Sequence, residues 1–197
     1  MKNIIRISAL LMSVTAILFT GCGNKPKPAV PVTVEPTGAQ IIKNGEYLVN
    51  IMGCNDCHSP KQVGPQGPVV ISELMLSGYP SDRQLQKVDA QVLKTGWVLM
   101  NEDLTAAAGP WGVSFSANLT SDQTGIGQWT EENFKRALKE GKYMGLEGGR
   151  TLLPPMPWTD FAYLTDEDVK AIFNYLQSTK PVKNVPPLPI APVEISK

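Results

Sequence analysis

The chain has 197 residues, of which 42% are hydrophobic, and its 18 basic side chains are balanced by 18 acidic ones. Without net positive charge it has no electrostatic surface for nucleic acid, so DNA or RNA binding is not expected. The length suits one folded domain with extensions. Only three cysteines and one histidine are present, which excludes any metal site that needs two histidines. With 17 glycines and 17 prolines, much of the domain is expected to be ordered loop.

The first 21 residues have the pattern of an export signal. A short basic start precedes an apolar stretch at 7–19, and its 13 residues are too few to cross a membrane, which takes about 20. Residues 18–22 resemble the lipobox of bacterial lipoproteins, in which the cysteine, here Cys22, carries the lipid. That family prefers leucine where this chain has Phe19. The resemblance implies export and lipid anchoring to a bacterial membrane, facing the periplasm; an uncleaved anchor or a secreted protein with an unused Cys22 are the alternatives.

The remaining chain is expected to form three parts. Residues 22–37 contain four prolines and predict a semi-rigid tether. The folded domain is expected at 38–187, and 188–197 is expected to be an extended C-terminal tail. Removal of Lys2 and Arg6 with the signal leaves 16 basic against 18 acidic residues, a net charge of −2, which suggests no strongly steered partner.

Residues 54–58 carry the strongest chemical signal. Cys54, Cys57 and His58 form a C-x-x-C-H string, the attachment signature of c-type haem. The two thiols reach the two vinyl groups on one porphyrin edge, and the adjacent histidine is delivered to the iron. The motif therefore predicts one covalently attached haem c, with His58 as an axial ligand. A zinc site lacks its remaining ligands, and a redox dithiol normally follows a strand, whereas a helical pattern precedes this motif.

Helical periodicity marks residues 39–52, residues 131–140 and a last helix that begins after Thr165. Thr130 and Thr165 are the expected N-caps, and Gly141 is the expected stop of the middle helix. The apolar faces, in chain order, are formed by Ile41, Gly45, Leu48 and Met52; by Phe134, Ala137 and Leu138; and by Val169, Ile172, Phe173 and Leu176.

Two terminal helices around a Gly/Pro-rich middle, with C-x-x-C-H closing the first, resemble the class I cytochrome c fold. This resemblance implies a mainly α fold in which the terminal helices pack across each other around a c-type haem. In that family a small residue lets the helices cross closely, and Gly45 against Ile172 and Tyr175 is expected to play that part. A long loop-rich insertion, residues 61–115, would follow the haem motif.

The second axial ligand is either a methionine or absent, because the chain has no second histidine. Met156 lies at 153–158, where prolines restrict the backbone on both sides. This run resembles the Met-ligand loop of the family, so Met156 is the predicted ligand. Met144 and a vacant sixth position are the alternatives; the other candidates in the domain are Met52, Met75 and Met100.

Other segments support narrower expectations. Residues 117–120 and 124–132 resemble a block of bacterial membrane-attached cytochromes c, including haem domains that serve dehydrogenases. Within the insertion, 69–76 and 97–100 are candidates to pair as strands, and 109–112 is expected to be a turn.

Three side chains are candidate haem contacts. Trp111 and Trp158 are candidate donors to a haem propionate, with plain packing as the alternative. Arg150 is a candidate partner on charge grounds, with a solvated surface arginine as the alternative. A carbonyl at 64–65 or 67–68 is expected to accept a hydrogen bond from the second ring nitrogen of His58, as in class I cytochromes.

These features predict a single-electron carrier with His58 and Met156 as axial ligands. Its partners would be envelope redox proteins such as a dehydrogenase, a respiratory complex or an oxidase. An iron with both axial positions filled has no place for substrate, so the chain by itself is not expected to be an enzyme. Two alternatives stay open: a haem-based sensor or small-gas binder with an open sixth site, and a structural lipoprotein without haem.

Overall fold

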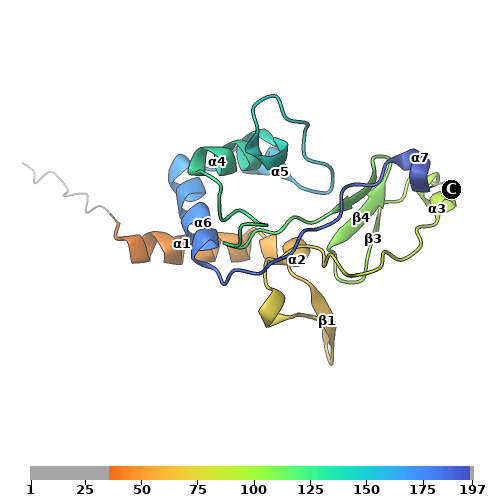
Figure 1. Ribbon diagram of the computed structural model, residues 1–197, viewed down its shortest axis with the longest axis horizontal. Coiled ribbons are helices and arrows are strands. Elements are labelled where there is room, and N and C mark those ends of the chain that lie inside the picture. The colour runs from red at the N-terminus through yellow and green to blue at the C-terminus, as the bar shows by residue number, and fades with distance from the viewer. Residues whose placement is uncertain (1–35, 196–197) are drawn as a thin grey trace, which may run out of the picture. The chain divides into compact units, whose positions relative to one another are not determined.

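A computed structural model of the protein describes residues 36–195 (Figure 1). The expected export signal (1–21), Cys22 and the tether up to residue 35 lie outside the described residues. The helices are α1 (Gly38–Ile51), α2 (Cys54–His58), α3 (Ala90–Leu93), α4 (Glu131–Glu140), α5 (Trp158–Phe161), α6 (Asp166–Ser178) and α7 (Pro192–Ile195), with 3-10 turns η1 (Ser72–Leu74) and η2 (Tyr143–Gly145). Within 36–195, no helix has the length and apolar character needed to cross a membrane.

The three main helices begin at threonine caps. Thr37, Thr130 and Thr165 each accept a hydrogen bond from a backbone N–H three residues on, and the side chain at that position caps in return. The expected caps at Thr130 and Thr165 are confirmed, and so is the stop at Gly141, whose φ of 64° is left-handed. Local sequence signals therefore placed these helices correctly to within about one residue.

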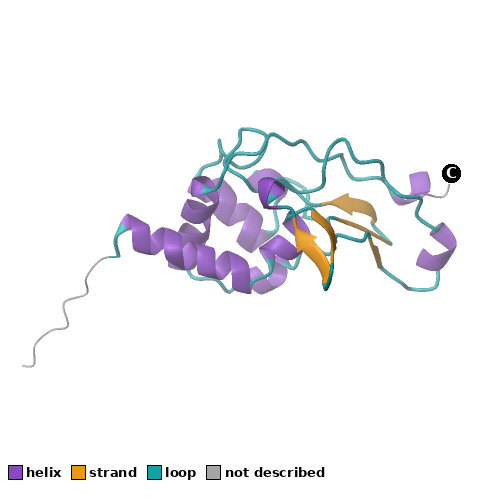
Figure 2. Cartoon of the chain, turned by 90° about the horizontal axis from the view of Figure 1, so that it is seen from below, coloured by secondary structure: helices purple, strands orange, loops and turns teal. Residues whose placement is uncertain are grey.

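Helices α1 and α6 cross each other (Figures 1 and 2), and Gly45 of α1 lies at the crossing. A Cβ at Gly45 would overlap the carbonyl of Ala171 and lie 2.7 Å from the Cβ of Tyr175. The close crossing expected at Gly45 is thus confirmed. Gly45 faces Tyr175, as expected, and also the backbone of Ala171, which was not expected. Ile172, the other expected partner, is 2% exposed in the core instead.

The hydrophobic core joins the helices to two loop positions. Val49 of α1 is fully buried, and Leu76 and Ile126 bring loops into the same cluster. The core cluster consists of Val49, Leu76, Ile126, Phe134, Leu138, Val169, Ile172 and Leu176. The inward faces expected for α4 and α6 are confirmed, with Phe173 only partly buried against the cluster. The contributions of Val49, Leu76 and Ile126 were not expected from the helical patterns.

Two small antiparallel sheets lie in the expected insertion (Figure 2). The first pairs β1 (Lys61–Gly64) with β2 (Gly67–Val70), and the second has the order β3 (Leu99–Met100), β4 (Ala106–Gly109) and β5 (Gly112–Phe115). The expected pairing of 69–76 with 97–100 was wrong. Strands separated by a short turn pair with little loss of chain entropy, and each segment found such a local neighbour. The turn at 109–112 is confirmed.

The chain after α6 is tied to the rest of the domain along its length. The side chain of Asn184 donates hydrogen bonds to the carbonyls of Ser77 (2.7 Å) and Tyr79 (2.9 Å). Ile190 forms a β-bridge with Val113 of β5. Residues 188–197 were expected to be an extended tail; the chain is extended up to residue 191, and α7 follows it.

Candidate functional site

Helix α2 presents two thiols on one face. Gly53, with a φ of 70°, turns the chain between α1 and α2. Cys54 and Cys57 are three positions apart on α2 and therefore neighbours on its surface. Both thiols are free, and Cys54 packs against the core cluster. Asp56, between them, is exposed.

The surroundings of the thiols do not suit a redox dithiol. Burial raises the pKa of Cys54 to about 11. Burial also raises the pKa of Cys57, against a lowering by the charge of Lys61. A reactive dithiol needs a lowered thiol pKa, and the element before α2 is helix α1 and not a strand. The arrangement presents two protonated thiols at neutral pH.

The imidazole of His58 is held by a long-range hydrogen bond. Its Nδ1 lies 2.8 Å from the carbonyl oxygen of Ala117. Because a carbonyl can only accept, Nδ1 carries the proton, and the neutral ring keeps its free lone pair on Nε2. Burial lowers the pKa of His58, the hydrogen bond to Ala117 raises it, and the charge of Lys61 lowers it, with a net lowering. His58 is therefore neutral at pH 7, with Nε2 available as a ligand.

The prediction that a carbonyl at 64–65 or 67–68 accepts the hydrogen bond from His58 was wrong. These residues form the tip of the β1–β2 hairpin, where Gly64 pairs with Gly67. The tip reaches solvent, since Val63 is 91% exposed. A carbonyl 59 residues from His58 along the chain takes the role instead.

Residues 116–120 hold that acceptor in place. The backbone N–H of Leu119 donates to the carbonyl of Leu76 at 2.8 Å, and that of Tyr79 donates to Ser116 at 3.0 Å. Asn118, 4% exposed, donates through its amide to the carbonyl of Val182 at 2.8 Å. The role of Ala117 as acceptor for His58 was not predicted. The resemblance of residues 117–120 to a block of bacterial membrane-attached cytochromes c was the one sequence signal for this segment.

Met156 packs against the core cluster, as Cys54 does. Its loop is tied to the second sheet, because Ser114 Oγ donates to the carbonyl of Pro154 at 2.6 Å. Met144, the alternative, is 48% exposed in η2. The remaining candidates are Met52, which caps α1 and touches the core cluster, and Met75 and Met100, which are 37% and 41% exposed.

Two of the three expected haem contacts meet at one cavity of about 430 Å³, which Trp111 and Arg150 line together with residues 188–192. The indole N–H of Trp111 donates to Ser114 Oγ at 3.2 Å. The guanidinium of Arg150 lies 3.9 Å from the centroid of the Tyr143 ring. Trp158 is placed elsewhere: its ring packs on Gly141, which ends α4.

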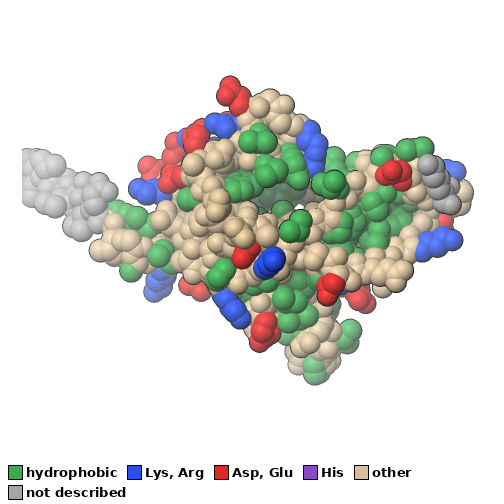
Figure 3. Space-filling model, in the orientation of Figure 1, with side chains coloured by type: hydrophobic (Ala, Val, Ile, Leu, Met, Phe, Trp, Pro, Cys, Tyr) green, Lys and Arg blue, Asp and Glu red, His purple; other side chains and the backbone are tan. Residues whose placement is uncertain are grey.

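The donor set fits a c-type haem. Two thiols share a helix face, the adjacent imidazole has a free Nε2, and the thioether of Met156 packs against the same core cluster as Cys54. Figure 3 shows a hollow with hydrophobic side chains between α5 and β4. Within residues 36–195, no three His, Cys, Asp or Glu side chains form a group that could hold a metal ion.

This helical fold with its C-x-x-C-H helix has the features of a c-type cytochrome, and comparison with known proteins supports a cytochrome c family. The chain is 29% identical over 178 residues to the fructose dehydrogenase cytochrome subunit of Gluconobacter japonicus, which covers 89% of this chain and 29% of that protein. It is 29% identical over 136 residues to the gluconate 2-dehydrogenase cytochrome c subunit of Pantoea cypripedii (68% and 22%). It is also 29% identical over 144 residues to the cytochrome c subunit of the quinone-dependent alcohol dehydrogenase from Gluconobacter oxydans (72% and 22%).

The similarity covers less than a third of each of these relatives. No family model matches the chain. All three relatives are named as cytochrome subunits of their dehydrogenases. These names are consistent with the expectation of an electron-transfer subunit that is not by itself an enzyme.

Proposed function

We propose that the chain is a monohaem class I cytochrome c that carries single electrons in the bacterial envelope. The observation that carries this proposal is the hydrogen bond from His58 to Ala117, next to two thiols on one face of α2. Cys54 and Cys57 would hold the haem through thioethers, and His58 Nε2 and Met156 would be the axial ligands of the iron. The bound haem supplies a one-electron redox couple.

The side chains around this site have separate tasks. The carbonyl of Ala117 fixes the orientation and tautomer of the His58 ring, so that Nε2 stays a neutral donor. The bond from Ser114 to Pro154 steadies the loop of Met156, which limits its rearrangement when an electron arrives or leaves. The core cluster shields Cys54 and Met156 in part from water, and apolar surroundings of this kind favour the reduced state.

The proposed partners are redox proteins, in the first place a dehydrogenase that delivers electrons. The support is that relatives of this chain are named as cytochrome subunits of dehydrogenases. A respiratory complex or an oxidase would accept the electrons. A lipid on Cys22 would hold the protein at a membrane, facing the periplasm; Cys22→Ser should then release the protein from the membrane fraction.

The test is expression of the full chain in a host that attaches haem c. The purified protein should keep its colour through a denaturing gel, and Cys54→Ala and Cys57→Ala should weaken or abolish this covalent signal. The far-red absorption band typical of Met-ligated oxidised haem should vanish in Met156→Ala and persist in Met144→Ala. Loss of the band in Met144→Ala alone would overturn the ligand assignment. Rapid CO binding to the reduced wild type would indicate an open sixth position, and a colourless protein would refute the proposal.

A further inference from the structure

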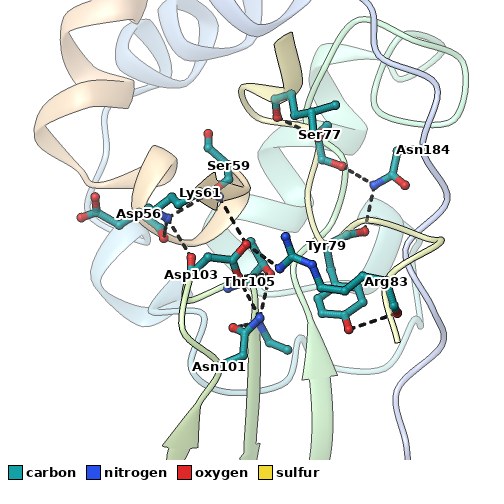
Figure 4. Close-up of polar contacts among 12 residues, drawn as sticks. Asp56, Ser59, Lys61, Ser77, Tyr79, Arg83, Asn101, Asp103, Thr105 and Asn184 are labelled. Atoms are coloured by element: carbon teal, nitrogen blue, oxygen red, sulfur yellow. Dashed lines mark hydrogen bonds and ion pairs between the residues drawn. The ribbon is translucent and has the colours of Figure 1, made fainter. Parts of the chain in front are cut away.

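A buried carboxylate lies between the C-x-x-C-H helix and the second sheet (Figure 4). Asp103, in the turn between β3 and β4, is 1% exposed. Its Oδ2 accepts from Arg83 at 2.5 Å, and its Oδ1 accepts from Thr105 Oγ1 at 2.6 Å and from Asn101 at 2.7 Å. The carboxylate is thus fully engaged, as a buried charge must be.

Lys61 connects Asp103 to the carboxyl end of α2. Its Nζ donates to the carbonyl oxygens of Asp103 (2.8 Å), Ser59 (3.1 Å) and Asp56 (2.5 Å). The carbonyls of Asp56 and Ser59 lie at the carboxyl end of α2, where unpaired helix carbonyls carry partial negative charge. The backbone N–H of Lys61 also donates to Asp103 Oδ2 at 3.3 Å. One ammonium group therefore fastens the end of the helix that carries His58.

Lys61, Arg83 and Asp103, here called the charged cluster, combine two positive charges with one negative charge. Lys61 Nζ makes direct hydrogen bonds to α2, whereas Arg83 is bonded to Asp103. The other charged side chain beside this end of α2 is Asp56, which is exposed and therefore better screened by water and salt. Lys61 is therefore the member of the cluster that bonds α2 directly, and its charge acts on His58.

We propose that the charged cluster raises the reduction potential of the haem carried by α2. With haem bound, the uptake of one electron from a redox partner would lower the positive charge of the iron centre by one unit. A fixed positive charge at Lys61 favours the less positive state, and Asp103 moderates this effect while it holds Lys61 in place. The inference rests on the proposed function and makes Lys61 a positioning and tuning residue of the same site.

The test is redox titration of the haem-loaded full chain and four variants. Lys61→Met should lower the potential and Asp103→Asn should raise it, each changing the ratio of reduced to oxidised protein at a fixed ambient potential by about threefold to tenfold. Lys61→Arg, which keeps the charge, should stay near the wild type. Lys170→Met is the control, since Lys170 is exposed on α6, and should leave the potential unchanged.

The opposite potential shifts expected for Lys61→Met and Asp103→Asn distinguish an effect of charge from a loosening of the structure around α2. If the cluster only braces α2, Lys61→Met, Lys61→Arg and Asp103→Asn would all admit water and all lower the potential, which would overturn the proposal. Unchanged potentials in Lys61→Met and Asp103→Asn would overturn it too. If Asp103→Asn does not fold, the contrast between Lys61→Met and Lys61→Arg still decides. A wild type without haem would refute the proposed function itself, whereas a Met-ligated wild type with unshifted variants would refute only this inference.

Discussion

The Nδ1 nitrogen of His58 lies 2.8 Å from the carbonyl oxygen of Ala117, although 59 residues separate the two in the sequence. The ring of the proposed iron ligand is therefore oriented by a loop from another part of the chain. Asn118 ties that loop to the segment after α6 through the carbonyls of Val182 and Asn184. The stability of this loop and the geometry of His58 should be coupled.

Asn118→Ala should reduce the free energy of unfolding by about 1–3 kcal/mol, because it removes the donor to the carbonyls of Val182 and Asn184 and the acceptor of the buried backbone N–H of Thr120. Urea unfolding followed by circular dichroism measures the change. Asn174→Ala is the matched control, since Asn174 makes a solvent-exposed hydrogen bond to the carbonyl of Lys170 in α6, and it should change stability by less than about 0.5 kcal/mol. Equal losses in the two variants would contradict the role assigned to Asn118.

Gly45→Ala should force α1 and α6 apart, because its Cβ would overlap the carbonyl of Ala171. Overpacking of this kind costs about 1–3 kcal/mol or more of unfolding free energy. Gly38→Ala is the control in the same helix: its Cβ meets nothing within 4 Å, so stability should be unchanged or slightly raised. Thermal or urea unfolding of both variants decides, and a neutral Gly45→Ala would refute the close crossing.

Ser114→Ala should loosen the loop of Met156, because Ser114 Oγ holds the carbonyl of Pro154 at 2.6 Å. If Met156 ligates the iron, added imidazole should displace it more readily, by about fivefold for a bond worth about 1 kcal/mol. Spectral titration of the oxidised protein with imidazole measures this affinity. Ser178→Ala is the control, since the hydroxyl of Ser178 donates to the carbonyl of Tyr175 in α6, and it should bind imidazole as the wild type does. Equal imidazole affinities of Ser114→Ala and Ser178→Ala would contradict a role of Ser114 in holding the loop of Met156.

Acid should destabilise the protein partly through Asp103. Burial tends to raise the pKa of Asp103, but hydrogen bonds from Thr105, Arg83 and Lys61 outweigh burial and hold it below its usual value. Because the folded pKa is lower than the unfolded one, this stabilisation is complete above about pH 4 and is lost as the pH falls through the folded value.

Urea unfolding between pH 7 and pH 2.5 should therefore show a smaller loss of stability in Asp103→Asn than in the wild type. The amide of the variant cannot titrate, so its contribution does not change with pH. Asp82→Asn, at an exposed position, should retain the wild-type dependence. An Asp103→Asn curve parallel to that of the wild type would show that another group governs the acid response.

Several features of this fold were predictable because their causes are local. Helix α4 follows from the Thr130 cap, an apolar face with a period of 3.6 residues and the left-handed stop at Gly141. The strand pairs were less predictable, because 69–76 and 97–100 have no partner-specific pattern. Each pairs instead with its neighbour along the chain.

The chemical groups of the candidate site are likewise written in the sequence. The spacing of Cys54, Cys57 and His58 specifies two thiols and an imidazole on one helical turn, and the lack of a second histidine leaves a methionine or a vacant site for the remaining position. Only the tertiary structure decided which carbonyl orients His58, which loop steadies Met156 and which charge lies at the end of α2. Those choices depend on contacts between residues far apart in the chain, whose geometry is set by packing and not by local spacing.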